Sequence, residues 1–70
     1  MTSLESLVRE LRQPLTAILS NAQAAQCMLD AAEPDGVEVR VILEEIVTCN
    51  LRAAGILLQL EKALQATAVP

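Results

Sequence analysis

The sequence predicts an all-α protein, an antiparallel helical hairpin that dimerises into a four-helix bundle. Three observations support this. Apolar residues recur every three or four positions through both halves of the chain, one strong turn signal separates the halves, and aromatic residues are absent. With 53% hydrophobic residues and no Phe, Trp or Tyr, the core must be aliphatic, which suits helix-on-helix packing. Because a 70-residue hairpin buries a small fraction of its surface, we expect a second chain to complete the core.

The first helix is expected over about residues 3–30, where Thr2 or Ser3 can cap its start. Its apolar residues alternate at intervals of four and three, the spacing of a coiled-coil seam. The seam consists of Leu4, Val8, Leu11, Leu15, Ile18, Ala22, Ala25 and Leu29, and the stripe is widened by Leu7, Leu19 and Met28. A stripe this wide predicts contact with more than one neighbouring helix.

The segment DAAEPDGVE is the one strong break in this pattern. Pro34 ends the first helix or opens the second, and Gly36 loosens the backbone. Asp35 and Glu38 have the spacing of a capping box at the start of a helix. We therefore place the turn at about residues 31–36.

The second helix is expected over about residues 37–66, before a fraying end. Its seam repeats the alternation, with Val39, Leu43, Ile46, Asn50, Ala53, Leu57, Leu60 and Leu64, and further apolar residues are Val41, Ile42, Val47, Leu51, Ile56 and Leu58. So wide an apolar circumference predicts two chains closing around one core. Asn50 either fixes the register of the helices or lies at the bundle margin. Gly55 costs about 1 kcal/mol relative to alanine in a helix and permits close approach or bending.

The dimer core predicted from the two seams is a set of aliphatic side chains. Its members are Leu4, Val8, Leu11, Leu15, Ile18, Leu43, Ile46, Leu57 and Leu60.

Composition argues against several kinds of partner and site. The net charge of -4, without a basic run or aromatic platform, argues against nucleic-acid binding. No apolar run approaches the roughly 18 residues of a membrane span, and the segment MTSLESL lacks signal-peptide features, so we expect a cytoplasmic protein without membrane contact. Cys27 and Cys49 lack metal-ligand spacing, and no histidine accompanies them, so no metal site is expected. The helical rise also separates these thiols too far for a disulfide within the hairpin.

The segment VRELRQPL places a proline inside the first helix. Pro14 removes one helical hydrogen bond at a cost of about 3 kcal/mol, and we interpret it as a hinge. Because Val8 points inward on the predicted seam, Arg9, Glu10 and Arg12 are expected to face solvent. The proline would thus follow an exposed, charged turn.

The segment LVRELRQPLTAILSNAQAA resembles the first helix of the dimerisation and phosphoacceptor (HisKA) domain of sensor histidine kinases, whose signature reads HELxQPLTAI in one large branch. The matching residues are Glu10, Leu11, Gln13, Pro14, Leu15, Thr16, Ala17 and Ile18. The segment EVRVILEEIV is more loosely similar to the second helix of that domain, and the resemblance covers about residues 4–62. It implies a homodimeric four-helix bundle whose histidine takes phosphate from ATP on a separate domain and passes it to a response-regulator aspartate.

The chain departs from this pattern at its chemical centre. Arg9 stands where the resemblance places the phosphoacceptor histidine, and the chain contains no histidine. A guanidinium stays protonated and has no free lone pair for attack on a phosphate. By the same match Glu10 corresponds to the assisting acid, which here has no nucleophile to assist. Without a glycine-rich ATP lid, no cofactor is expected, and the chain by itself is predicted not to be an enzyme.

We therefore expect a catalytically silent dimerisation domain of two-component signal transduction, acting as a homodimeric signalling or scaffold module or as part of a longer kinase-like protein. An alternative is a stand-alone adaptor that binds a response-regulator receiver domain or a kinase ATP-binding domain without phosphotransfer. Its contacts would be Arg9, Arg12 and Gln13. Arg9 can instead simply pair with Glu5 one turn away. A third reading is a helical oligomerisation module without a signalling role.

Overall fold

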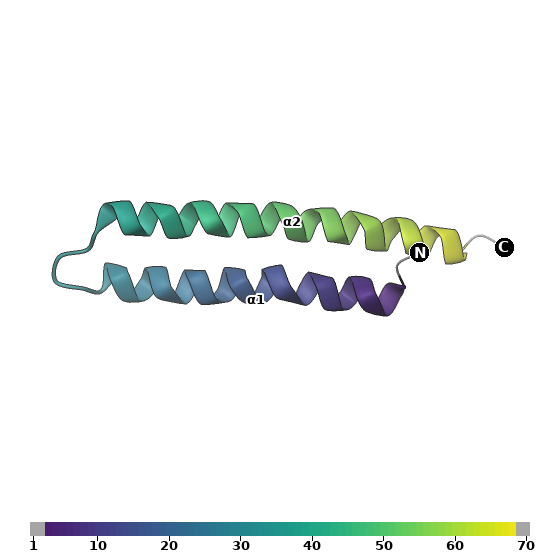
Figure 1. Ribbon diagram of the computed structural model, residues 1–70, viewed down its shortest axis with the longest axis horizontal. Helices are drawn as coiled ribbons and strands as arrows, with labels where there is room; N and C mark the ends of the chain where they lie inside the picture. Colours follow the sequence, from purple (N-terminus) through teal and green to yellow (C-terminus); the bar gives the residue numbers. More distant parts are fainter. Residues whose placement is uncertain (1–2, 69–70) are drawn as a thin grey trace.

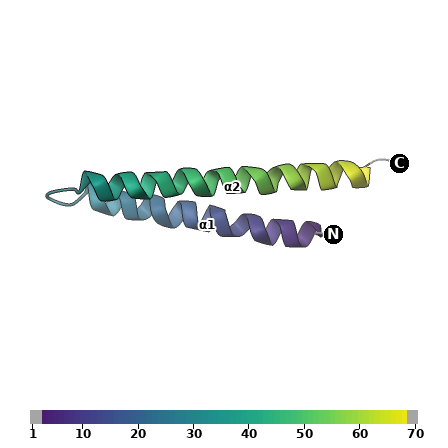
Figure 2. The same ribbon diagram turned by 45° about the horizontal axis from the view of Figure 1, so that its top comes forward.

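The computed structural model describes residues 3–68, which form two helices joined by a short loop (Figure 1). Helix α1 spans Leu4–Leu29 and helix α2 spans Gly36–Ala68. The helices lie side by side and antiparallel in both views, and α2 extends past the start of α1 (Figures 1 and 2). The hairpin is a rod of 60 × 16 × 15 Å. Residues 3–68 contain no strand, so the predicted all-α hairpin is confirmed.

Hydrogen bonds from side chains fix the start of each helix. At the start of α1, the Ser6 backbone N–H donates to Ser3 Oγ over 3.1 Å, so Ser3 is the cap. Thr2, the other predicted cap, lies outside the described residues. At the start of α2, Asp35 Oδ1 accepts from the backbone N–H of Val37 at 2.9 Å and of Glu38 at 3.3 Å. In a capping box, the side chain of the first residue accepts from the backbone N–H three residues later, and the bond from the Glu38 N–H to Asp35 is this bond.

The observed boundaries differ from the predicted ones by one or two residues. The loop occupies residues 30–35, and α2 begins at Gly36, which has no positive φ and follows the Asp35 cap. Pro34 precedes the cap within the loop, so it neither ends α1 nor opens α2. The C-terminal segment remains helical to Ala68, two residues beyond the predicted end, because nothing after Gly55 interrupts the helical pattern.

The two helices pack through a seam that is shifted from the predicted one. The buried and half-buried residues along it are Leu7, Leu11, Pro14, Ile18, Asn21, Ala25 and Met28 in α1, and Val39, Ile42, Ile46, Cys49, Ala53, Ile56, Leu60 and Ala63 in α2. Both sets again alternate by four and three. Leu11, Ile18, Ile46 and Leu60 of the predicted dimer core therefore pack within the hairpin.

The remaining members of the predicted dimer core are exposed in the single hairpin. Val8 was expected to point inward, but it follows the seam residue Leu7 and lies beside the seam, as Leu15 does after Pro14. In antiparallel helices, the rows that directly follow the seam lie on the same side of the hairpin. We name this side the lateral face, formed by Val8, Leu15, Leu19, Leu29, Leu43, Val47, Leu57 and Leu64. Leu4 is also exposed, at the open end of the rod.

Two further predictions concern the membrane and the thiols. Within residues 3–68, neither helix combines the length and apolar character that a membrane crossing needs. Cys27 is exposed, Cys49 is half-buried, and both are free thiols, as expected from their separation along the rod.

Candidate functional site

The charged turn before Pro14 lies on the surface of α1, as predicted. Arg9, Glu10, Arg12 and Gln13 are all exposed, whereas less than 2% of the Pro14 surface is accessible. The four polar residues occupy consecutive turns near the start of α1. They are therefore available to a partner molecule without any rearrangement of the hairpin.

Pro14 is a core residue of the hairpin. Helix α1 continues through it from Leu4 to Leu29, and its ring lies on the seam that faces α2. The buried residues of α2, Ala53 and Ile56, lie in the same half of the rod. The missing backbone hydrogen bond therefore coincides with a packed contact, and bending of α1 at this point would disturb its packing on α2.

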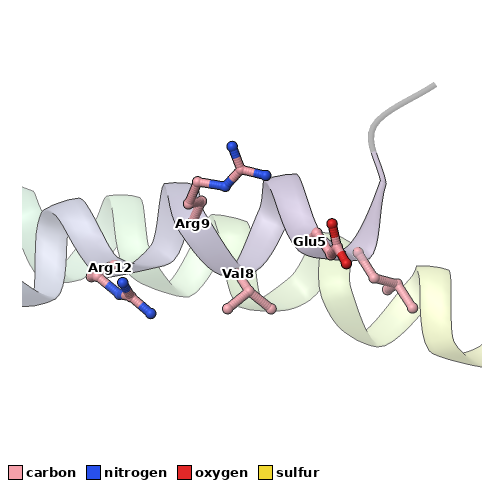
Figure 3. Close-up of a pocket in the computed structure, with 5 residues that line it drawn as sticks. Glu5, Val8, Arg9 and Arg12 are labelled. Carbon is pink, nitrogen blue, oxygen red and sulfur yellow. The ribbon is translucent and has the colours of Figure 1, made fainter.

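Two shallow depressions flank Arg9 on the surface of α1. One is lined by Ser6, Arg9, Glu10 and Gln13. The other is lined by Leu4, Glu5, Val8, Arg9 and Arg12 (Figure 3). Each of them combines arginine with a glutamate, so neither is a concentrated basic patch.

The predicted partner-binding residues do not converge on one point. The side chains of Arg9 and Arg12 point to different sides of α1 (Figure 3). Arg9 shares one depression with Gln13 and the other with Arg12. A single carboxylate or phosphate would therefore meet one guanidinium, while an extended acidic surface could contact both.

The side chains of this turn are suited to binding an anion. Arg9 can donate hydrogen bonds to an anion but cannot attack one, and Glu10 next to it has no imidazole to orient. No group of three or more His, Cys, Asp or Glu side chains suited to a metal ion occurs in the part of the chain that the structure describes.

Three buried residues of the hairpin core, Leu7, Pro14 and Ile56, lie outside the seams predicted from the sequence. Leu7 and Ile56 were assigned to the margin of their stripes, yet both are buried, Leu7 at 3% exposure. The signal was present, because Leu7, Leu11, Pro14 and Ile18 also alternate by four and three. The proline on that row obscured it.

Comparisons with known proteins yield no relative. No family model, curated protein or solved structure matches the chain. The functional assignment depends on the residues and their geometry.

Proposed function

We propose that this chain is a dimerisation domain of histidine-kinase type that is silent at its phosphoacceptor position and acts as a homodimeric signalling or scaffold module. One observation carries the proposal. The residues that resemble the kinase motif form an exposed turn directly before the buried Pro14, with Arg9 in the place of the histidine. A phosphoacceptor turn must be exposed in this way for other domains to reach it.

The lateral face supports the dimeric part of this proposal. Large aliphatic side chains from both helices gather on it, and a second hairpin that covers them would complete a four-helix bundle. If both turns lie at the same end, α1 of one chain runs beside α2 of the other. Leu19 lies ten residues before the end of α1 and Val47 eleven residues after the start of α2, so they meet at the same level. Leu15 and Asn50 would be level in the same way, so in the proposed bundle Asn50 would lie at the interface between chains.

Restoring the histidine tests the kinase-like part of the proposal. The Arg9→His variant, mixed with ATP and ATP-binding domains of histidine kinases supplied in trans, is expected to gain an acid-labile phosphate. Its imidazole would stand on an exposed turn beside Glu10, which can hold the ring proton. Phosphate incorporation is followed with labelled ATP.

Arg9→Ala and the unchanged chain serve as controls and should remain unlabelled. An Arg9→His protein that stays dimeric and unlabelled with every kinase domain tried would contradict the assignment.

A second candidate function is a stand-alone adaptor that docks on the acidic pocket of a receiver domain. The favouring observation is that Arg9 borders two open depressions, one of which Arg12 also lines. Titration of receiver domains should then show weaker binding by Arg9→Ala, by roughly tenfold for one lost charge-assisted contact. Thr16→Ala, an exposed change elsewhere on α1, is the matched control. Equal affinities for all three proteins would exclude this role.

A further inference from the structure

A second surface with exposed aliphatic side chains, interspersed with polar ones, lies on the side of α2 that faces away from α1. We name it the outer stripe, formed by Val37, Val41, Glu44, Thr48, Leu51, Gly55, Leu58 and Lys62, all exposed. These residues alternate by four and three, the spacing of a helix-packing seam. Val37 and Leu51 are the most exposed large aliphatic side chains described, at 73% and 68%. Neither the hairpin seam nor the lateral face uses them.

Gly55 has no explanation within the hairpin. A Cβ atom at this position would meet nothing within 4 Å, and the residue has no positive φ. Glycine inside a helix nevertheless costs about 1 kcal/mol relative to alanine. It lies between Leu51 and Leu58 on the outer stripe, and we name this gap in the row of side chains the notch, because another molecule could approach the backbone closely there.

Thr48 is compatible with an apolar contact in the middle of the outer stripe. Its hydroxyl donates to the backbone carbonyl of Glu44 over 3.1 Å. The polar atom therefore already has a partner on its own helix, so covering Thr48 leaves no donor unsatisfied.

The rows of side chains on both flanks of the outer stripe are charged in a self-complementary way. On one flank, Glu45 is followed seven residues later by Arg52. On the other flank, Arg40 precedes Glu61. Each flank thus changes sign along the helix. An antiparallel copy of the same helix would therefore place opposite charges face to face on both flanks.

We propose that the outer stripe binds a second copy of this chain, with α2 pairing antiparallel to α2 about a two-fold axis between Thr48 and Leu51. In this register, Glu45 faces the second copy's Arg52, and the symmetric pair forms on the other side of the axis. Such a self-complementary patch is what an isologous interface requires.

The same register brings most of the stripe into matching contacts, while Val37 at the end of the contact lies against the stem of the second copy's Lys62. Val41 meets the second copy's Leu58, Thr48 meets Leu51, and the stem of Glu44 lies over Gly55. Arg40 faces the second copy's Glu61 on the remaining flank.

Other registers lose this complementarity. A shift of one heptad places either Arg52 beside Arg52 or Glu45 beside Glu45 on the axis. In a parallel arrangement the two different flanks face each other, which leaves Arg40 beside the second copy's Glu45 and loses both contacts of the antiparallel register. The charges therefore select the register, while apolar burial supplies the affinity, since exposed ion pairs alone contribute little.

This interface is independent of the proposed signalling function, and its stripe is distinct from the lateral face, although Arg40 and Glu61 lie on the row of Val47 at the edge of that face. A bundle formed through the lateral faces would carry two outer stripes, one on each α2. Association through them would link bundles, so the mass of the protein should rise beyond the dimer as concentration increases.

A charge-swap series tests the proposal by light scattering and sedimentation. The unchanged protein is expected to form tetramers and larger species at high concentration. Arg52→Glu should weaken the association into tetramers at least about tenfold, because an acid then faces an acid across the interface. Glu45→Arg should weaken it by a similar factor, because an arginine then faces an arginine. The double variant Glu45→Arg with Arg52→Glu should associate as strongly as the unchanged protein, because opposite charges face each other again. The proposal would be overturned by a double variant that associates as weakly as the single variants, or by an unchanged protein that remains dimeric at millimolar concentration.

Two further variants separate the surfaces. Gly55→Gln should raise the helicity and thermal midpoint of the hairpin while weakening tetramer formation, because its side chain fills the notch. Assembly as strong as that of the unchanged chain would refute the role of the notch. Leu15→Glu changes only the lateral face. Any association that this variant retains through the outer stripe should therefore still be weakened by Arg52→Glu.

Discussion

If the chain dimerises as proposed, changing both Leu15 and Leu57 to glutamate is expected to convert the dimer into a monomer that has lost much of its helix. The two leucines are 51% and 48% exposed in the single hairpin and lie on the lateral face, one on each helix. In the proposed bundle, the new carboxylates would be buried, and Arg12 on the row of Leu15 would offset only part of the desolvation cost. At a loss of at least about 3 kcal/mol, the thermal midpoint should fall by roughly 12 °C or more. Light scattering measures the mass, and circular dichroism the helix content.

The matched control places the same charge elsewhere on α1. Thr16 is exposed and lies outside the hairpin seam and the lateral face, so Thr16→Glu should remain dimeric and helical. The midpoint of the unchanged protein should also rise with concentration, because association stabilises the fold. A double leucine variant that keeps the mass and midpoint of the unchanged chain would contradict the four-helix bundle.

The helices and their turn could be predicted from the sequence because local signals define them. Ser3 and Asp35 cap helices with bonds to backbone N–H groups that are close in sequence, so tertiary structure has no influence on them. The apolar periodicity was long enough to exclude strands. The one-residue errors on either side of the loop arose because Pro34 lies in the loop and marks neither helix end.

The identity of the packed row could not be predicted with the same certainty. In α1, the rows beginning at Leu4 and at Leu7 both alternate by four and three, and they share Leu11, Ile18 and Ala25. Which row faces α2 depends on the partner helix, and so on tertiary packing. Because proline is a helix breaker, a search for apolar periodicity disfavours the row that contains Pro14. In the structure, however, its ring has no N–H to satisfy and suits a buried seam.

The exposure of the motif turn followed from its place beside the seam, but the layout of its side chains did not. Arg9 and Arg12 are three residues apart on one helix, so sequence spacing places them as neighbours. Their long side chains nevertheless point to different sides of α1 (Figure 3). Rotamers of exposed arginines are set by local surroundings that spacing does not encode.

The observed seam predicts a large loss of stability for Ile56→Ala. Ile56 is 8% exposed and belongs to the few buried hydrophobic residues of the hairpin. Truncating a buried isoleucine to alanine typically costs about 2–5 kcal/mol. That is a large share of the roughly 5–15 kcal/mol that stabilises a typical domain. Urea unfolding, followed by circular dichroism, measures the loss as a lower midpoint with an unchanged slope.

Leu51→Ala is the matched control because Leu51 lies on the same helix but on its outer side. Alanine favours the helix at least as well as leucine, so the free energy of unfolding should stay within about 0.5 kcal/mol of the unchanged value. Both variants are measured at a concentration too low for the proposed association of outer stripes, so that only the hairpin and the proposed bundle contribute. Since only the seam buries Ile56, equal losses for the two variants would mean that the helices pack through the opposite side of α2.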